Sequence, residues 1–457
     1  MAITSVVSRS HLEDTLRLDA EYYQPAYLDM ELRIMKTGSY VPWGHIGGKF
    51  ITGPFGSEFI VGNYVSEGSY RYVRGQDVKE FFLLDSDNVY IPEKDYERLN
   101  KYVLTEGDIL ISVVGTLGNA AVVDKAVPPA IFSCKSTLFR STTINPFYLI
   151  AYLNCRFGRA LLQRKVRGAV QTGLNIDDLR SLPVFTAESP LQDEIANLVL
   201  NAKESYDRSK SVYCQAENLL LEGLGLKDFK PKYELSYTAN LSKAFGVRRV
   251  DAEYFQPAYD EMIDYLKAKF KIEKLIYLGS KKEIKINPNP QQAYRYIEIS
   301  DIRTDVGEVT HSERLGSELP PNARIPIGGG ELLVSKVRPT RKAIAIVSDE
   351  LRKTTICSSA FTVFNISSPL KEYVFVALRS IVGLLQLERP TTGTEYPTLK
   401  DEDVENTLVP ILPKETQQKI ASLVQQSHEA RRKAKELLEE AKRKVEQEIE
   451  AASVDQH

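Results

Sequence analysis

Lysine and arginine side chains gather in two stretches of this 457-residue chain that hold no acidic residue. Residues 133–168 contain seven bases, and residues 335–348 contain four. Such side chains neutralise phosphates and release counterions, and arginine can also form bidentate hydrogen bonds with base edges. The chemistry they could do is the binding of a polyanion, above all nucleic acid. A solvated basic face, balanced by acids elsewhere on the surface, is the alternative interpretation.

Short glycine-containing loops accompany these bases. A GPFGS loop at residues 53–57 offers backbone N–H groups and a hydroxyl to a phosphate, and residues 171–173 and 392–394 form similar loops. A plain turn is the alternative for each loop. The candidate nucleic-acid contacts are Gly53, Phe55, Gly56, Ser57, Arg71, Arg74, Gln76, Lys135, Arg164, Lys165, Arg167, Gln171, Thr172, Arg295, Lys336, Arg338, Arg341, Lys342, Thr392, Thr394 and Tyr396.

Motifs that would indicate catalysis are missing from the sequence. It contains no phosphate-binding GxxxxGK[ST] loop, no GxGxxG before a helix and no GxSxG nucleophile elbow. Residues 145–148 and 287–290 come nearest to the [NDS]PP[YFW] tetrapeptide of adenine methyltransferases, and both depart from it. We therefore expect a protein that is not an enzyme, with no catalytic residue and no bound cofactor.

Cysteine, histidine and hydropathy exclude further classes of protein. Four scattered cysteines and five scattered histidines form no CxxC, HExxH or mixed cluster, so neither a disulfide framework nor a metal site is expected. Hydrophobic residues make up 43% and charged residues 26% of the chain, and the net charge is −2, which is ordinary globular composition. No apolar run approaches the roughly 18 residues of a membrane span, and no secretory signal is visible, so we expect a cytoplasmic protein.

The elements that position the candidate residues follow from an internal duplication. Residues 18–27 (LDAEYYQPAY) and 250–259 (VDAEYFQPAY) are identical at eight of ten positions, at an offset of 232. The segments YRYVRGQDV and GDILIS, at residues 70–78 and 107–112, recur in the same order at offsets of 224 and 223. The chain is therefore a tandem repeat of two halves, each of about 225 residues.

Each half has the same predicted order of elements. The repeated YxQPAY segment is followed by short apolar runs that read as strands, such as residues 109–114 and 343–347. A helical stretch comes next, at residues 146–165 and at about 369–387. One long helix then ends each half.

The two long helices carry an apolar seam with alternating spacings of four and three residues. We expect the helices to pack against each other as an antiparallel coiled coil, because a twofold relation between the halves would reverse their directions. The alternative is that each helix packs only on its own half. The expected seam residues are Leu191, Ile195, Leu198, Val212, Leu219, Ile420, Leu423 and Leu437.

The ordered set of motifs resembles the specificity subunit of type I restriction–modification systems over nearly the full length. The motifs are the GPFGS loop, YVRGQDV at residues 72–78, GDILIS, and TGLNIDDLRSLPV at residues 172–184 leading into the helix start PLQDEIA. The resemblance implies an α+β chain with two tandem α/β target recognition domains joined by the coiled coil. The implied segments are a first domain at residues 1–188, a first spacer helix at 189–223, a linker and second domain at 224–413, and a second spacer helix at 414–452.

The resemblance also implies a function and a set of partners. Each domain would read one part of a split target in double-stranded DNA, and the helices, about 50 Å long at 1.5 Å per residue, would set the gap between the parts. The chain would bind two methyltransferase subunits and restriction (translocase/nuclease) subunits. S-adenosylmethionine, ATP and magnesium would be bound by those partners and not by this chain.

The second half departs from the family pattern, and two other hypotheses stay open. Residues 280–292 replace the GPFGS loop, so carrying DNA contacts from one half to the other is less safe there. One alternative is a non-catalytic protein–protein adaptor with two related domains. The other is a fused methyltransferase or nuclease, which the missing motifs oppose.

Overall fold

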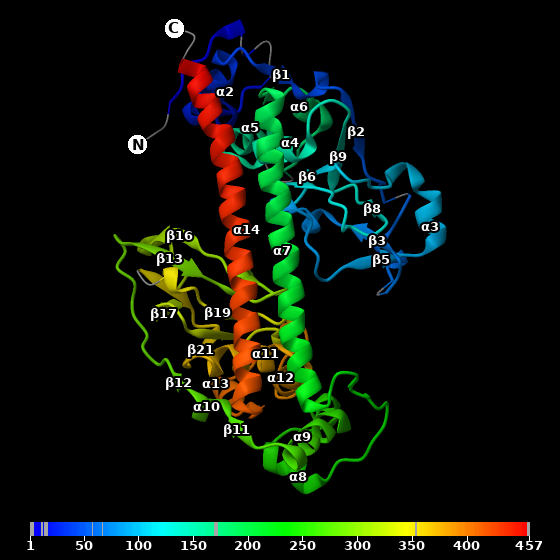
Figure 1. Ribbon diagram of the computed structural model, residues 1–457, viewed down its shortest axis with the longest axis vertical. Helices are drawn as coiled ribbons and strands as arrows, with labels where there is room; N and C mark the ends of the chain where they lie inside the picture. The colour runs from blue at the N-terminus through cyan, green and yellow to red at the C-terminus, as the bar shows by residue number, and fades with distance from the viewer. Residues whose placement is uncertain are drawn as a thin grey trace. The chain divides into compact units, whose positions relative to one another are not determined.

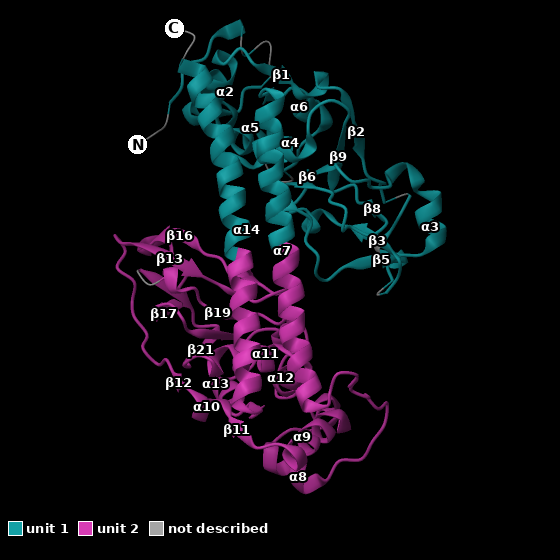
Figure 2. Ribbon diagram, viewed as in Figure 1, with its two compact units in different colours: residues 1–205, 432–457 teal, residues 206–431 magenta. Residues whose placement is uncertain are grey.

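The computed structural model describes residues 4–10, 12, 17–56, 58–65, 67–168, 172–351 and 354–454 (Figure 1). The chain divides into two compact units (Figure 2). Unit 1 consists of residues 1–205 and 432–457, and unit 2 of residues 206–431. Each long helix contributes residues to both units, so this division differs from the four segments that the resemblance implies, which remain a prediction. Within the described residues, no helix is both long enough and apolar enough to span a membrane.

Unit 1 is a mixed α+β unit built on two sheets. Its five-stranded sheet has the order β2-β9-β6-β7-β4, and its three-stranded sheet has the order β5-β3-β8. The strands are β1 (Tyr40–Pro42), β2 (Gly48–Thr52), β3 (Tyr70–Val73), β4 (Phe81–Phe82), β5 (Val89–Ile91), β6 (Ile109–Ser112), β7 (Ala120–Val122), β8 (Ala130–Phe132), β9 (Ser136–Ser141) and β10 (Pro183–Phe185). The helices are α2 (Pro25–Lys36), α3 (Glu93–Arg98), α4 (Pro146–Asn154), α5 (Arg156–Lys165) and α6 (Ile176–Arg180).

Unit 2 repeats this plan with two four-stranded sheets, β12-β21-β18-β19 and β16-β13-β20-β17. The strands are β11 (Ile272–Lys274), β12 (Ser280–Lys281), β13 (Ala293–Ile297), β14 (Ile302–Arg303), β15 (Glu308–Val309), β16 (Ser312–Leu315), β17 (Ala323–Ile327), β18 (Leu332–Ser335), β19 (Ile344–Ile346), β20 (Thr355–Ser358), β21 (Phe361–Asn365) and β22 (Leu408–Pro410). The helices are α8 (Leu241–Val247), α9 (Pro257–Lys269), α10 (Leu275–Leu278), α11 (Leu370–Arg379), α12 (Ile381–Glu388) and α13 (Asp401–Glu405).

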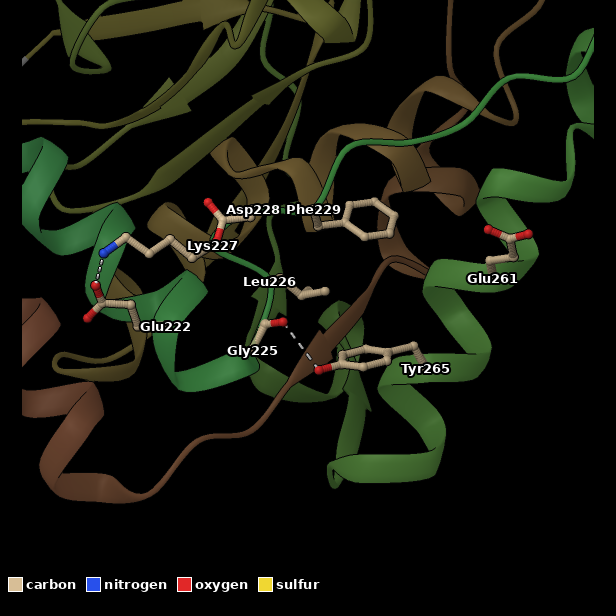
Figure 3. A pocket seen from close by; sticks show the side chains of 8 residues that line it. All are labelled: Glu222, Gly225, Leu226, Lys227, Asp228, Phe229, Glu261 and Tyr265. Atoms are coloured by element: carbon tan, nitrogen blue, oxygen red, sulfur yellow. Dashed lines mark hydrogen bonds and ion pairs between the residues drawn. The ribbon is translucent and has the colours of Figure 1, made fainter.

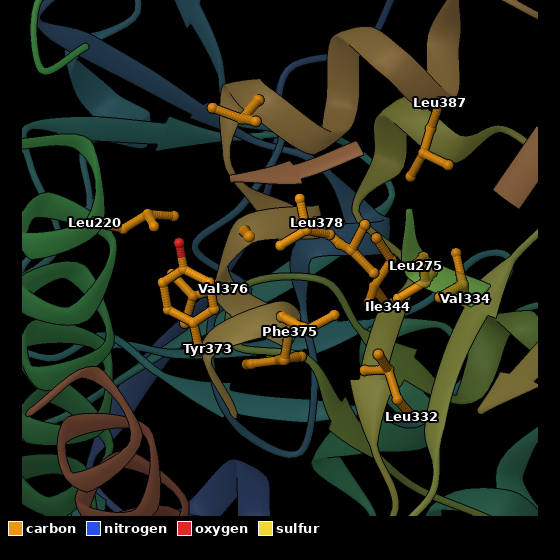
Figure 4. Close-up of a cluster of buried hydrophobic side chains, with 14 of the residues drawn as sticks. Leu220, Leu275, Leu332, Val334, Ile344, Tyr373, Phe375, Val376, Leu378 and Leu387 are labelled. Carbon is orange, nitrogen blue, oxygen red and sulfur yellow. The ribbon is translucent and has the colours of Figure 1, made fainter. Parts of the chain in front are cut away.

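Matching hydrogen bonds and pairings confirm the duplication in three dimensions. The parallel pair β3–β8 of unit 1 recurs as β13–β20 in unit 2, with Arg71 opposite Ala130 and Arg295 opposite Thr355. The buried Tyr148 hydroxyl donates to the carbonyl of Phe185, and Tyr373 donates in the same way to Pro410. Apolar side chains of α11, β18 and β19 fill the main core of unit 2 (Figure 4).

The repeated YxQPAY segment is attached in each unit by an arginine that precedes it. In unit 1, Arg17 donates to the carbonyls of Lys165 and Val166 at 3.2 and 3.0 Å and to Asp19 at 2.8 Å. In unit 2, Arg249 donates to the carbonyls of Pro390 and Thr391 at 2.8 and 2.9 Å and to Asp251 at 2.8 Å. These hydrogen bonds lower the pKa of each partner aspartate. The segment is therefore attached at the end of the helix pair of its own unit, α4–α5 or α11–α12, which explains why it is repeated.

The long helices α7 (Ser189–Leu224) and α14 (Lys414–Val454) pack together, as the seam predicts (Figure 1). Within unit 2, the Ser209 and Ser427 hydroxyls lie 3.1 Å apart, and the Arg431 guanidinium lies 4.4 Å from the centre of the Tyr206 ring. Partner numbers fall on one helix as they rise on the other, so the pair is antiparallel there.

The seam that the structure shows is wider than the one expected from sequence. Ile195, Val212 and Ile420 are buried, whereas Leu191, Leu198, Leu219, Leu423 and Leu437 are only partly buried. Val199, Val424 and Leu438 take buried positions beside them. The reason is that each helix also packs on the sheet domain of its unit, which requires an apolar face broader than two positions per heptad.

One buried position of the seam holds a charged residue, which the apolar seam pattern does not predict. Arg431 is 3% exposed, and its guanidinium pairs with Asp305 at 3.3 Å and Glu308 at 2.6 Å. Burial opposes its ionisation, but the charges of Asp305 and Glu308 raise the pKa of Arg431 overall. A polar layer formed by Ser209, Ser427 and Arg431 therefore interrupts the apolar seam and fixes its register.

The predicted single helical stretch in each half is a pair of helices. α4 ends and α5 begins around Cys155, and α11 and α12 are divided in the same way around Ser380. A glycine in the second helix of each pair allows the close approach. A Cβ on Gly158 would lie 2.1 Å from the Tyr152 carbonyl oxygen, and one on Gly383 would lie 2.3 Å from Leu378 Cα.

We predict that Gly158→Ala and Gly383→Ala each lower the free energy of unfolding by about 1–3 kcal/mol or more, since the added methyl group collides with backbone atoms. Thermal unfolding of the two variants would measure the effect. Gly246→Ala is the matched control, because nothing lies within 4 Å of the added Cβ. Equal melting temperatures for all three variants would contradict the close-packing account.

Candidate nucleic-acid interface

Two loops meet at one surface in each unit. We call them the turn loop, at residues 113–119 and 336–342, and the helix loop, at residues 166–173 and 391–398. In unit 1, Arg167 and Gly173 exchange backbone hydrogen bonds of 2.9 and 2.8 Å, and Leu174 N donates to the Val113 carbonyl at 3.1 Å. In unit 2, Thr392 and Thr398 exchange bonds of 3.0 and 2.9 Å, and Leu399 N donates to the Lys336 carbonyl at 2.8 Å. The backbone hydrogen bonds that join the described parts of the two loops are the same in both units.

In unit 2 this loop pair brings together most of the residues expected from sequence. The Arg338 guanidinium lies 4.3 Å from the centre of the Tyr396 ring, and its Nη2 donates to the Glu395 carbonyl at 3.2 Å. Thr392, Thr394, Tyr396 and Arg341 are exposed around it. Lys342 Nζ lies 3.8 Å from a Glu217 carboxylate oxygen. The result is a basic, partly aromatic surface with backbone amides available at its edge.

Two other expected bases of unit 2 have local partners. Lys336 Nζ donates to Asp401 at 2.8 Å, and Thr362 donates to the same oxygen at 2.8 Å. Burial opposes the ionisation of Asp401, but these hydrogen bonds lower its pKa overall. Arg295 lies on β13, where its guanidinium is 3.9 Å from Glu313 and donates to the Glu350 carbonyl at 3.4 Å. Neither residue joins the surface around Arg338.

In unit 1 a row of turns extends from the GPFGS loop to the turn loop. Gly53 packs closely on the Ser133 carbonyl, since a Cβ at this position would lie 2.4 Å from it. In contrast, Phe55 is 63% exposed, and a Cβ on Gly56 would have no atom within 4 Å. Val113 N donates to the Lys135 carbonyl at 2.9 Å. A Cβ on Gly75 would lie 2.7 Å from Lys135 Cβ.

The exposed residues of this row are Phe55, Gly56, Gln76, Lys135 and Thr172. They come from four separate turns of the first half, which supports their grouping in one candidate interface. Ser57 and Gln171, also expected in this set, lie outside the described residues. The turn loop of this unit, residues 113–119, contains no charged residue.

Two bases of the first acid-free stretch, Arg164 and Lys165, are buried and stabilise the fold, and a third, Arg167, is exposed but ion-paired. Arg164 is buried, donates to the Tyr22 carbonyl at 2.8 Å and to Glu31 at 2.5 Å, and stacks on the Tyr22 ring. Lys165 Nζ donates to the Ser181 hydroxyl at 3.0 Å, and burial lowers the pKa of Lys165. Arg167 donates to Asp178 through two nitrogens, at 2.9 and 2.6 Å. In this conformation Arg164 has no exposed surface with which to contact DNA.

The counterpart of Arg164 in the second half supports a structural role. Arg389, at an offset of 225, donates to the Tyr254 carbonyl at 3.2 Å and to Asp260 at 2.8 Å and stacks on the Tyr254 ring. The same contacts in both units show that this arginine anchors the repeated segment. The recurrence of arginine at 164 and 389 could have indicated this structural role from sequence. A count of charges alone does not reveal that a side chain is buried.

Arg71 and Arg74 also differ from the sequence expectation. Arg71 is 1% exposed and donates to the Leu84 carbonyl, and burial lowers its pKa. Arg74 pairs with buried Asp77 at 2.9 Å, within a short turn that also uses the Arg74 backbone N–H. Gln76, two residues further on, is exposed at the edge of the candidate interface.

Other features of the described residues do not resemble a cofactor or metal site. No group of three His, Cys, Asp or Glu side chains in the described ranges could hold a metal ion. A cavity of about 620 Å³ in unit 2 lies beside the end of α7, where Tyr265 donates to the Leu224 carbonyl at 2.9 Å. Figure 3 shows the lining residues and the contact of Tyr265 with the Gly225 carbonyl. None of the expected contact residues lines this cavity.

Comparison with solved structures finds similar chains in restriction–modification systems. The S subunit of a type I restriction-modification system from M. genitalium is 12% identical; the match covers 90% of this chain and 95% of that one, with a TM-score of 0.40. The HsdS subunit from Thermoanaerobacter tengcongensis is 31% identical, over 34% of this chain and 40% of that one, with a TM-score of 0.30.

A chain from a structure described as the basis of complex assembly and conformational transition of the type I R-M system is 12% identical. This match covers 91% of the present chain and 97% of that one, with a TM-score of 0.28. No family model and no curated protein matches the chain. The solved structures thus carry the name of the family that the sequence motifs resemble.

We predict that Arg164→Ala lowers the free energy of unfolding by about 3 kcal/mol, because it leaves Glu31 without its buried partner. Arg389→Ala should have a similar effect on unit 2. Thermal unfolding would measure both changes. Arg341→Ala, which removes an exposed guanidinium, is the control and should leave the melting temperature within experimental error. A melting temperature of Arg164→Ala equal to that of the control would contradict the anchoring role.

Proposed function

We propose that this chain is the DNA-recognition subunit of a type I restriction–modification complex. Unit 1 and unit 2 each contact one part of a bipartite target in double-stranded DNA, and the α7–α14 coiled coil sets the separation of the two parts. The chain itself carries out no reaction. Two methyltransferase subunits and the restriction subunits bind to it and supply the chemistry, with S-adenosylmethionine, ATP and magnesium held on those subunits.

The observation that carries the proposal is the loop pair present in both units. Its backbone hydrogen bonds are the same in the two halves, at Arg167–Gly173 and at Thr392–Thr398, whereas its exposed side chains differ. A shared backbone presented twice suits a ligand with a repeating, twofold-related backbone, which duplex DNA has. Different side chains on that backbone suit two different half-sites.

The candidate contacts divide by the surface they offer. In unit 2 we assign Arg338, Arg341, Lys342, Thr392, Thr394 and Tyr396 to the DNA surface, and in unit 1 Phe55, Gly56, Gln76, Lys135 and Thr172. Gly53 supports the GPFGS loop from behind. Arg71, Arg74, Arg164, Lys165, Arg167, Arg295 and Lys336 act through their intramolecular partners and position the loops.

The experiment is to express the chain with its methyltransferase and map methylated adenines in cellular DNA. We expect methylation at one bipartite sequence with an unread gap of fixed length. An exchange of residues 250–413 for those of a related chain should change one part of the sequence and leave the other unchanged. A chain that retains no duplex at low salt, with the methyltransferase present, would instead favour the protein–protein adaptor.

We also predict that Arg341→Ala makes the plot of log binding constant against log salt concentration less steep by about 0.9. The reason is that one phosphate is no longer neutralised and keeps its counterions when the protein binds. Filter binding of the complex to a random duplex at several salt concentrations would measure this. Lys336→Ala is the matched control, because its ammonium group is engaged by Asp401. An unchanged slope for Arg341→Ala would remove this residue from the interface.

A further inference from the structure

The turn loops of the two units differ in sequence and by one residue in length. Ser112 N bonds to the Asn119 carbonyl, and Ser335 N bonds to the Ala343 carbonyl, so six residues lie between the bonded pair in unit 1 and seven in unit 2. Counted from the two ends of each loop, Gly115 corresponds to Arg338 and Gly118 to Lys342. Both glycines have left-handed backbone, with φ of 88° and 76°. Arg338 and Lys342 have φ of 48° and 58°, so unit 2 places two basic side chains where unit 1 has glycine.

A left-handed conformation is unfavourable for arginine and lysine, because the Cβ atom crowds the backbone. Glycine adopts it without this penalty, and the shorter loop of unit 1 has glycine at both positions. Arginine and lysine are therefore not the residues that a left-handed turn favours. Their presence at these strained positions of a surface loop points to a role for their side chains.

The Arg338 side chain is also held in one orientation before any ligand arrives. Its guanidinium stacks on the exposed Tyr396 ring at 4.3 Å, one nitrogen donates to the Glu395 carbonyl, and its backbone N–H donates to the Pro397 carbonyl at 2.8 Å. Pro339 follows it directly and restricts its backbone. Arg338 is half-buried, and among the described residues the Nη2–Glu395 bond is the one hydrogen bond of its guanidinium, which leaves further N–H donors for a ligand.

We propose that Arg338 is the base-reading residue of unit 2 and that it recognises a guanine in the major groove. This inference rests on the proposed function. A planar, fixed pair of donors matches the O6 and N7 acceptors of guanine, whereas a phosphate contact needs only a mobile positive charge. Arg341, which is exposed, and Lys342, at the end of the loop, contact the flanking phosphates. Tyr396 is the positioning residue that orients Arg338.

The test uses the full chain in complex with its methyltransferase and a pool of randomised DNA duplexes. Arg338→Gly restores the residue of unit 1 and relieves the left-handed strain. We expect its melting temperature to be equal to or above that of the unaltered chain, while preference for one G·C pair in the unit 2 half-site falls about ten- to a hundredfold. Affinity for unrelated duplexes should change by much less.

Matched variants separate reading from charge. Arg341→Ala should weaken all duplexes alike and leave the selected sequence unchanged. Tyr396→Phe keeps the ring and should keep the selected sequence, whereas Tyr396→Ala should reduce the preference at the same base pair as Arg338→Gly.

Three outcomes would overturn the assignment. They are an unaltered sequence preference for Arg338→Gly, an equal loss for all duplexes, and a lost preference at a base pair in the half-site of unit 1. If the unaltered complex selects no sequence at all, the proposed function fails and the assignment fails with it. Selection by the unaltered complex with any of the three outcomes overturns the assignment alone.

Discussion

The interface depends on an arginine clasp that is built twice in this chain. Arg17 and Arg249 bind the carbonyls that directly precede Arg167 and Thr392, which are the residues that open the bridge of each helix loop. Arg164 and Arg389 attach the same repeated segment from the other side. Without the clasp, the last turn of α5 or α12 would have no fixed end, and the helix loop could not hold the turn loop. The surface that we assign to DNA therefore depends on guanidinium groups that are buried in unit 1 and half-buried in unit 2.

Electrostatics explains why these arginines are paired with carboxylates and carbonyls. A buried guanidinium is costly unless carboxylates and carbonyls satisfy it, and each clasp supplies both. The effect on the partners is visible in Asp19 and Asp251, whose pKa values are lowered by the hydrogen bond from the neighbouring arginine. In contrast, Arg341 is exposed, and the Arg338 guanidinium uses only some of its N–H donors in hydrogen bonds within the protein. Burial separates Arg71, Arg164 and Lys165 from the exposed Arg341, a difference that position in the sequence does not reveal.

Much of the architecture could be predicted because repeats and helical periodicity are local properties of the sequence. The ten-residue repeat located both halves, and α7 begins at Ser189, where the first spacer helix was expected to begin. The burial of Arg164 could not be read from the same data, because seven bases without an acid look alike whether their acids lie nearby in space or not. Glu31 and Asp178, which pair with Arg164 and Arg167, are distant in sequence or fall outside the basic stretch. The seam pattern predicts the buried face of α14 at Leu423 and Leu437, one residue away from its observed position. The pattern describes contact between two helices only, whereas these helices also cover a sheet.

The duplication also separates what must stay constant from what can vary. Both units keep the clasp, the parallel strand pair and the bridged loops, since these set the position of the backbone facing the ligand. They differ at Gly115 and Arg338 and at Gly118 and Lys342, where the backbone is left-handed in both units and the side chains differ. If both units read identical half-sites, there would be no reason for one to accept left-handed arginine and lysine where the other uses glycine. The strain in the turn loop of unit 2 is therefore best explained by a ligand whose two parts are chemically different, which is what a bipartite, asymmetric DNA target presents.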